Sequence, residues 1–248
     1  MHTVSFLAQV PVTLECPEAM GAAVRYVLEG EYESHHDGAH LDILDIGANV
    51  GAFAIWAALR WPGSRIFSYE PNPGTFAMLK RNTAAFANVS CFNSALFPGA
   101  RLREPFFARF DGDGEGGLVT YASDTFEARV VKPSFEVSVV DPATLPSADV
   151  VKIDIEGGEA AVLAALDLSR TSLVLIEFQN RRNRLAMRQL LSGAFEPVLD
   201  EECPWDPILD YQDYRRELKG DIYGRMFYAR QGQTRLQRHM SRQPSEPA

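Results

Sequence analysis

Short apolar runs alternate with helical segments along most of this chain. Residues 41–46 read as a buried strand, and residues 51–61 continue with apolar side chains at helical spacing. Further strands are expected at 65–70, 89–95, 150–154 and 173–178, and further helices at 73–86, 158–166 and 182–191. This alternation predicts an α/β fold, in which a doubly wound, mostly parallel sheet has helices on both faces.

Two regions interrupt the alternation. Residues 98–141 lack helical spacing and contain a glycine-rich turn, which indicates a β-rich insertion. Residues 222–229 follow a loop and are expected to add an antiparallel strand at the edge of the sheet. Residues 1–40 are a weakly patterned lead-in, with a helix expected near 18–28, and could form a lid. Residues 231–248 are polar and are expected to be disordered.

Composition narrows the classes of partner. The net charge of −9 argues against nucleic acid, because binding a phosphate backbone needs a basic surface. The three cysteines lie far apart and suggest neither disulfides nor a zinc site. No membrane-spanning run and no signal peptide are evident, so a cytoplasmic location is expected. A homo-oligomer is left open.

A turn of small residues links the first strand to its helix. Gly47, Ala48, Asn49 and Gly51 lie where open parallel sheets bind ligands, and a helix N-terminus follows. In the dinucleotide fingerprint the second glycine would fall on Asn49, whose side chain would crowd a pyrophosphate. The turn therefore favours S-adenosylmethionine, whose amino-acid tail could meet Asn49 and the turn amides. A turn that needs glycine for geometry alone is the plainer alternative.

The next two strand ends suggest contacts to an adenosine. Glu70 ends the second strand, where a carboxylate can accept hydrogen bonds from both ribose hydroxyls. NAD and S-adenosylmethionine both carry such a ribose, so Glu70 does not distinguish them. Ser94 ends the third strand, where an adenine edge would lie.

An acidic segment ends the fourth strand. Asp154 is expected at the rim of the ligand crevice, followed by Glu156 in the loop and Glu159 in the next helix. Acids there would attract a cationic sulfonium, and a carboxylate could accept the proton of an attacking hydroxyl. Glu159 could equally serve the helix dipole. Lys152 could pair with an acid, and Glu177 could face the substrate or pair with a nearby arginine.

Taken together, these motifs resemble the FkbM-type methyltransferases. The resemblance runs from about residue 41 to 180 and rests on DIGANVG, YEPNP, NSALF, VVKIDIEGGEAAVL and LVLIEFQ. The D-I-E-G-x-E block is its most specific part. Gly158 departs from the alanine that is more common in that block, and residues 181–248 match poorly, which leaves the acceptor pocket undefined.

The resemblance implies a class I, Rossmann-like methyltransferase domain over residues 41–230. It also implies S-adenosylmethionine as donor, S-adenosylhomocysteine as product and a hydroxyl acceptor on a small molecule or glycoside in secondary metabolism. No metal site is expected, although a metal-assisted mechanism is left open. An NAD-dependent oxidoreductase and a non-catalytic binding protein are the alternatives. Asp154 and Glu156 are the catalytic candidates, and the cofactor candidates are Asp45, Gly47, Ala48, Asn49, Gly51, Glu70, Asn72, Ser94 and Asp154.

Overall fold

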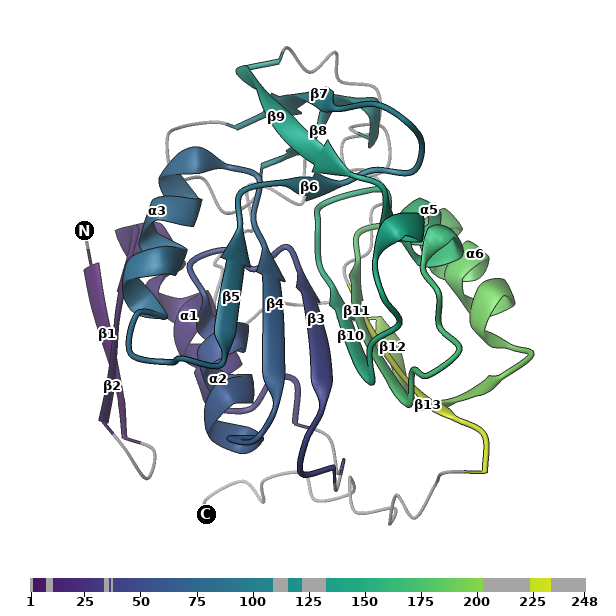
Figure 1. Ribbon diagram of the computed structural model, residues 1–248, viewed down its shortest axis with the longest axis horizontal. Coiled ribbons are helices and arrows are strands. Elements are labelled where there is room, and N and C mark those ends of the chain that lie inside the picture. Colours follow the sequence, from purple (N-terminus) through teal and green to yellow (C-terminus); the bar gives the residue numbers. More distant parts are fainter. Residues whose placement is uncertain are drawn as a thin grey trace, which may run out of the picture.

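A seven-stranded sheet forms the centre of the molecule (Figure 1). The computed structural model describes residues 2–7, 11–33, 36, 38–108, 116–121, 133–202 and 224–232. The strand order is β12-β13-β11-β10-β3-β4-β5. Five strands run parallel, namely β3 (Asp42–Ile46), β4 (Arg65–Tyr69), β5 (Val89–Phe92), β10 (Val150–Ile153) and β11 (Leu173–Phe178). The predicted α/β class is thus confirmed.

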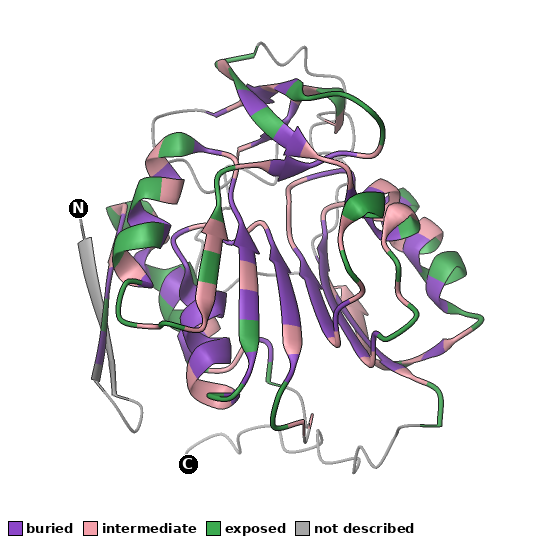
Figure 2. Ribbon diagram, in the orientation of Figure 1, coloured by how far each residue is buried: buried purple, intermediate pink, exposed green. Residues whose placement is uncertain are grey.

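Helices cover both faces of this sheet. Helices α1 (Gly21–Leu28), α2 (Ala52–Arg60) and α3 (Pro73–Asn82) lie on one face, and α5 (Glu159–Ala165) and α6 (Arg181–Leu191) on the other. Successive strand side chains point to opposite faces. Ile43 therefore packs in the core under α2, and Leu44 packs in the core under α5 and α6. Figure 2 shows β3, β10 and β11, in the middle of the sheet, almost wholly buried, as continuous apolar runs require.

The C-terminal strands differ from the sequence expectation. β13 (Gly224–Arg230) is antiparallel to β11, as predicted, but it is not at the edge. β12 (Phe195–Glu202) pairs outside it. The sequence of β12 contains Pro197 and several acids, a composition that is typical of a loop. An edge strand tolerates both, and the pairing register shifts at Pro197.

The N-terminal lead-in is part of the packed structure. β1 (His2–Leu7) and β2 (Pro11–Cys16) form a separate antiparallel hairpin, and a short 3-10 helix (Glu18–Met20) precedes α1. Apolar side chains from β2 and α1, with Tyr32, join the core around α2. A lid role would require this segment to leave that core.

The insertion forms a second sheet above the carboxyl ends of the central strands (Figure 1). It contains β6 (Ala95–Leu96), β9 (Phe135–Val140), β7 (Arg103–Phe107) and β8 (Gly117–Leu118), in that order. The strand expected over 89–95 is divided here, because the chain leaves one sheet after β5 and enters the other at β6. Two short 3-10 helices, Val119–Tyr121 and Pro142–Thr144, lie nearby in sequence. Most of the glycine-rich turn lies outside the described residues.

Candidate active site

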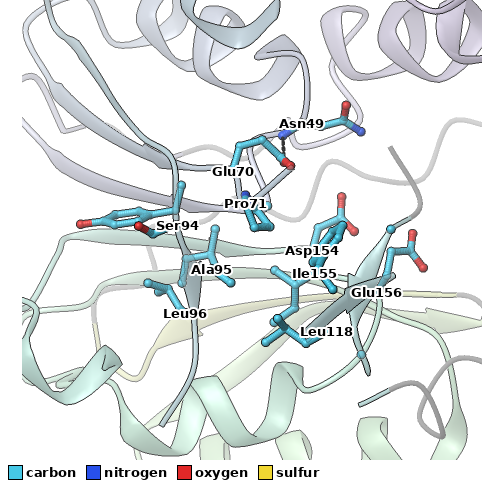
Figure 3. Close-up of a pocket in the computed structure, with 16 residues that line it drawn as sticks. Asn49, Glu70, Pro71, Ser94, Ala95, Leu96, Leu118, Asp154, Ile155 and Glu156 are labelled. Atoms are coloured by element: carbon cyan, nitrogen blue, oxygen red, sulfur yellow. Dashed lines mark hydrogen bonds between the residues drawn. The ribbon is translucent and has the colours of Figure 1, made fainter. Parts of the chain in front are cut away.

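A pocket lies between the ends of the central strands and the insertion (Figure 3). The space between its lining residues is about 580 Å³, of which part is open solvent at its mouth. Figure 3 shows Glu70, Pro71 and Ser94 along one side and Asp154, Ile155 and Glu156 along the other. The candidate site residues that line it are Gly47, Asn49, Glu70, Ser94, Asp154 and Glu156.

The amides of the glycine turn are already used within the chain. Gly47 and Ala48 both donate to the Tyr69 carbonyl, and Asn49 donates to Glu70 Oε2 at 2.9 Å. The next two amides donate to Asn49 Oδ1 and to the Ala48 carbonyl. We expected turn amides to meet the carboxylate of a donor. The structure instead uses them to hold the turn against the end of β4.

The turn passes very close to the end of β10. Gly47 has φ +80°, and a Cβ there would lie 1.7 Å from the Asp154 carbonyl oxygen. Only glycine permits this approach. The Asp154 amide also donates to the Ile46 carbonyl at 3.0 Å. Gly51, with φ +95°, is the residue just before α2 and lies close to Leu79. It contributes to the shape of the turn but does not line the pocket.

Glu70 is a buried carboxylate that organises two turns. Its Oε2 accepts from Asn49 N and its Oε1 accepts from Asn72 N at 2.8 Å. Burial raises the pKa of Glu70 to about 7, although the two amides and Lys152 pull it down. Each carboxylate oxygen can accept a second hydrogen bond, which is what a pair of hydroxyls requires. Asn72 is buried and caps α3 through Gly74 N.

Beneath the turn lies a buried ionic group. Lys152 donates to the Gly47 carbonyl at 2.6 Å and lies 3.5 Å from both Asp45 Oδ1 and Asp154 Oδ2. Burial raises the pKa of Asp45, against the pull of Lys152 and of the Ser68 hydroxyl. Asp45 is fully buried and does not line the pocket, whereas Asp154 does.

The acidic loop after β10 has an unusual backbone. Glu156, Gly157 and Gly158 have φ values of +56°, +115° and +88°. Glu156 and Asn49 are the non-glycine residues with positive φ among those described, and both line the pocket. Such conformations cost energy and concentrate at functional sites. This adds an independent reason to place the chemistry here.

Glu159, the third acid of the segment, has a structural position. It is fully buried, accepts from Gly157 N at 2.7 Å and binds the side-chain amide of Asn183. It thereby ties the acidic loop to α6. Because its carboxylate does not line the pocket, the alternative of a structural acid fits this residue better than a catalytic one.

Several pocket residues were not singled out from the sequence. Phe106, Gly116 and Leu118 reach the pocket from the insertion, and Leu96 lines it beside Ser94. The sequence offered no clear signal for them, because β7 reads REPFF without apolar alternation and a sequence does not show where a second sheet docks. Two basic residues near the start of α6, Arg181 and Arg184, pair with acids of β12 and do not line the pocket. Aromatic residues of the divergent C-terminal part could cover an acceptor pocket or simply pack, but they lie outside the described residues: Trp205, Tyr211, Tyr214 and Tyr223.

Comparison with known proteins identifies the family to which this chain belongs. The model of the Methyltransferase FkbM domain matches residues 45–212. Methyltransferase 1 of Beauveria bassiana is 26% identical over 66% of this chain and 76% of its own length. The 31-O-demethyl-FK506 methyltransferase FkbM of Streptomyces tacrolimicus is 24% identical, over 80% and 94% respectively. The hexuronic acid methyltransferase AglP of Haloferax volcanii is 26% identical over 62% of each chain.

Proposed function

Because the chain belongs to the FkbM methyltransferase family and is an S-adenosylmethionine-dependent methyltransferase, we propose that it methylates a hydroxyl of a small molecule or glycoside. The observation that carries this proposal is the convergence of Asn49, Glu70 and Asp154 on one pocket at the carboxyl ends of neighbouring strands. Family membership favours methyl transfer over the nicotinamide-dependent alternative.

The residues present suit the donor. Glu70 has two oxygens that can each accept a further hydrogen bond, and would hold the ribose hydroxyls. Ser94 and Ala95 would border the adenine, and the Asn49 side chain would meet the amino-acid tail. Asp154 would face the sulfonium, since a carboxylate favours a cation in a partly desolvated site.

When bound, the donor supplies an electrophilic methyl group. The acceptor oxygen would bond to that carbon as the carbon–sulfur bond breaks, which would leave the bonding pair on sulfur as a neutral thioether. The hydroxyl proton would pass to a carboxylate, for which Asp154 is the first candidate and Glu156 the second. The residues of this site contribute mainly by aligning oxygen, carbon and sulfur.

The insertion would provide the acceptor side. Phe106, Leu118 and Leu96 form an apolar wall of the pocket that Asp154 and Glu156 also line. Such a pocket suits a small molecule that carries a hydroxyl on an apolar body. The relatives named for FK506 and for a hexuronic acid act on natural products and sugars, and we extend that range to this chain. A cytoplasmic location and the exclusion of nucleic acid remain parts of the proposal. Among the described helices, none is long and apolar enough to cross a bilayer.

The test compares two carboxylates at opposite ends of β10. Asp154→Asn should abolish methyl transfer to a panel of hydroxylated natural products and glycosides, detected as the added mass of a methyl group. Asp149→Asn is the matched control, because Asp149 has a similarly exposed side chain and pairs with Arg170 away from the pocket. Full transfer by a folded Asp154→Asn protein would refute the role of Asp154.

A further inference from the structure

Lys152 is a cation in the middle of the buried sheet. It lies on β10, is 3% exposed and sits opposite Asp45 in the register with β3. Burying an ammonium is costly unless it is paired and hydrogen-bonded. The sequence indicated only that this lysine could pair with an acid.

The ammonium contacts several elements of the site at once. It donates to the carbonyl of Gly47 in the turn, and it pairs with Asp45 on β3 and with Asp154 at the end of β10. The Phe53 ring of α2 lies 5.9 Å away. Burial would lower the pKa of Lys152, but Asp154, Asp45 and Glu177 together raise it. The lysine therefore stays charged.

None of these contacts places Lys152 in the pocket, which it does not line. Two of its partners do: Gly47 and Asp154. We propose that Lys152 is a positioning residue of the donor site, whose ammonium holds the Gly47 carbonyl and the Asp154 carboxylate in one fixed arrangement. This inference rests on the donor pocket of the proposed function and is independent of the acceptor.

A purely structural role is the competing explanation. Asp45 is fully buried, and its Oδ1 has no hydrogen-bond partner apart from the ion pair at 3.5 Å. If Lys152 served only to compensate Asp45, removing both charges together would remove the need for it. If Lys152 positions Gly47 and Asp154, removing both charges would restore stability but not donor binding.

The test therefore uses the variants Asp45→Asn, Lys152→Met and Asp45→Asn/Lys152→Met. Lys152→Met alone should melt well below wild type, because it leaves a buried carboxylate unpaired. The double variant should melt close to Asp45→Asn. Calorimetric titration should nevertheless show that it binds S-adenosylmethionine and S-adenosylhomocysteine about tenfold more weakly than Asp45→Asn does, the scale of one charged hydrogen bond.

Two results would overturn the proposal. Equal donor affinities in the double variant and in Asp45→Asn would show that Lys152 only compensates Asp45. Equal affinities in Lys152→Met and wild type would show that its charge is irrelevant to the pocket. Failure of wild-type protein to bind either ligand would instead refute the donor pocket itself. Failure to find an acceptor would affect only the proposed hydroxyl chemistry.

Discussion

At the scale of single residues, the pocket depends on how closely two backbones approach. Gly47 and the Asp154 carbonyl oxygen leave no room for a Cβ. This contact places the glycine turn next to Asp154. The turn would hold the amino-acid tail of the donor, and Asp154 would face its methyl group. A side chain at residue 47 would therefore change stability and donor binding together.

We predict that Gly47→Ala lowers the free energy of unfolding by more than about 3 kcal/mol, because it combines left-handed backbone strain with a clash. Donor binding should be lost with it. Gly99→Ala is the matched control: Gly99 has φ +113°, but nothing lies within 4 Å of a Cβ there. That variant should lose only about 1 kcal/mol. Urea unfolding measures both, and equal losses would mean that the clash is relieved by movement of the turn.

Residue types at strand ends could be predicted, but the use of backbone groups could not. Glu70 and Asp154 stand out in sequence because a carboxylate that ends an apolar strand needs a reason to be there. The sequence does not show that Glu70 also accepts from Asn49 and Asn72, because those bonds depend on where two turns meet. The same holds for the Gly47 carbonyl, which is bound by Lys152.

At the scale of elements, the insertion is seated directly on the acidic loop. A Cβ on Gly158 would lie 2.4 Å from the Tyr121 ring, and a Cβ on Gly117 would lie 3.0 Å from the Glu156 carbonyl oxygen. Tyr121 also packs against Phe97, with ring centroids 5.7 Å apart. Gly158, the position at which this chain departs from the more common alanine, is therefore the position that admits Tyr121.

We predict that Gly158→Ala destabilises the protein, and that Tyr121→Ala relieves part of this effect. The double variant should be more stable than the sum of the two single effects allows, by about 1–3 kcal/mol, because the two residues contact each other. Part of the loss should persist, since φ at residue 158 remains +88°. Chemical denaturation of the four proteins gives the coupling, and strict additivity would contradict direct docking of Tyr121 on this loop.

The parallel part of the sheet was predictable because each strand and helix has its own apolar period. The residues at which strands begin and end were harder to predict. Residues 89–95 were predicted as one strand, yet the Asn93 side chain donates to the Glu70 and Pro71 carbonyls, and the chain changes sheets there. β12 was missed because it lies at the edge and pairs with a strand on one side only. Such a strand can contain Pro197 and several acids, so its sequence lacks a strand pattern.

At the scale of the whole molecule, we predict that donor binding is linked to protonation through Glu70. The pKa of Glu70 in the folded protein, about 7, lies above its ordinary value of 4.5. The folded state without ligand therefore holds the proton more tightly than the unfolded state. This contribution to stability is complete below the ordinary pKa and is lost as the pH rises through about 7.

Binding of the donor should have the opposite dependence on pH. A carboxylate accepts hydrogen bonds from two ribose hydroxyls better than a carboxylic acid does, so binding should release the proton of Glu70 below about pH 7. The affinity for S-adenosylhomocysteine should then rise by up to about tenfold per pH unit on the acid side and become constant above about pH 7. The gain in melting temperature caused by the ligand should follow the same curve.

Glu70→Gln separates this linkage from other titrating groups. The glutamine should bind the ligand more weakly, because one of its ends is a donor and cannot accept from both Asn49 and Asn72. Its affinity should also lose the dependence on pH across this range, and calorimetry in buffers of different ionisation enthalpy should no longer detect proton release. A pH dependence that persists in Glu70→Gln would assign the proton to another group, and would mean that Glu70 is already ionised when the pocket is empty.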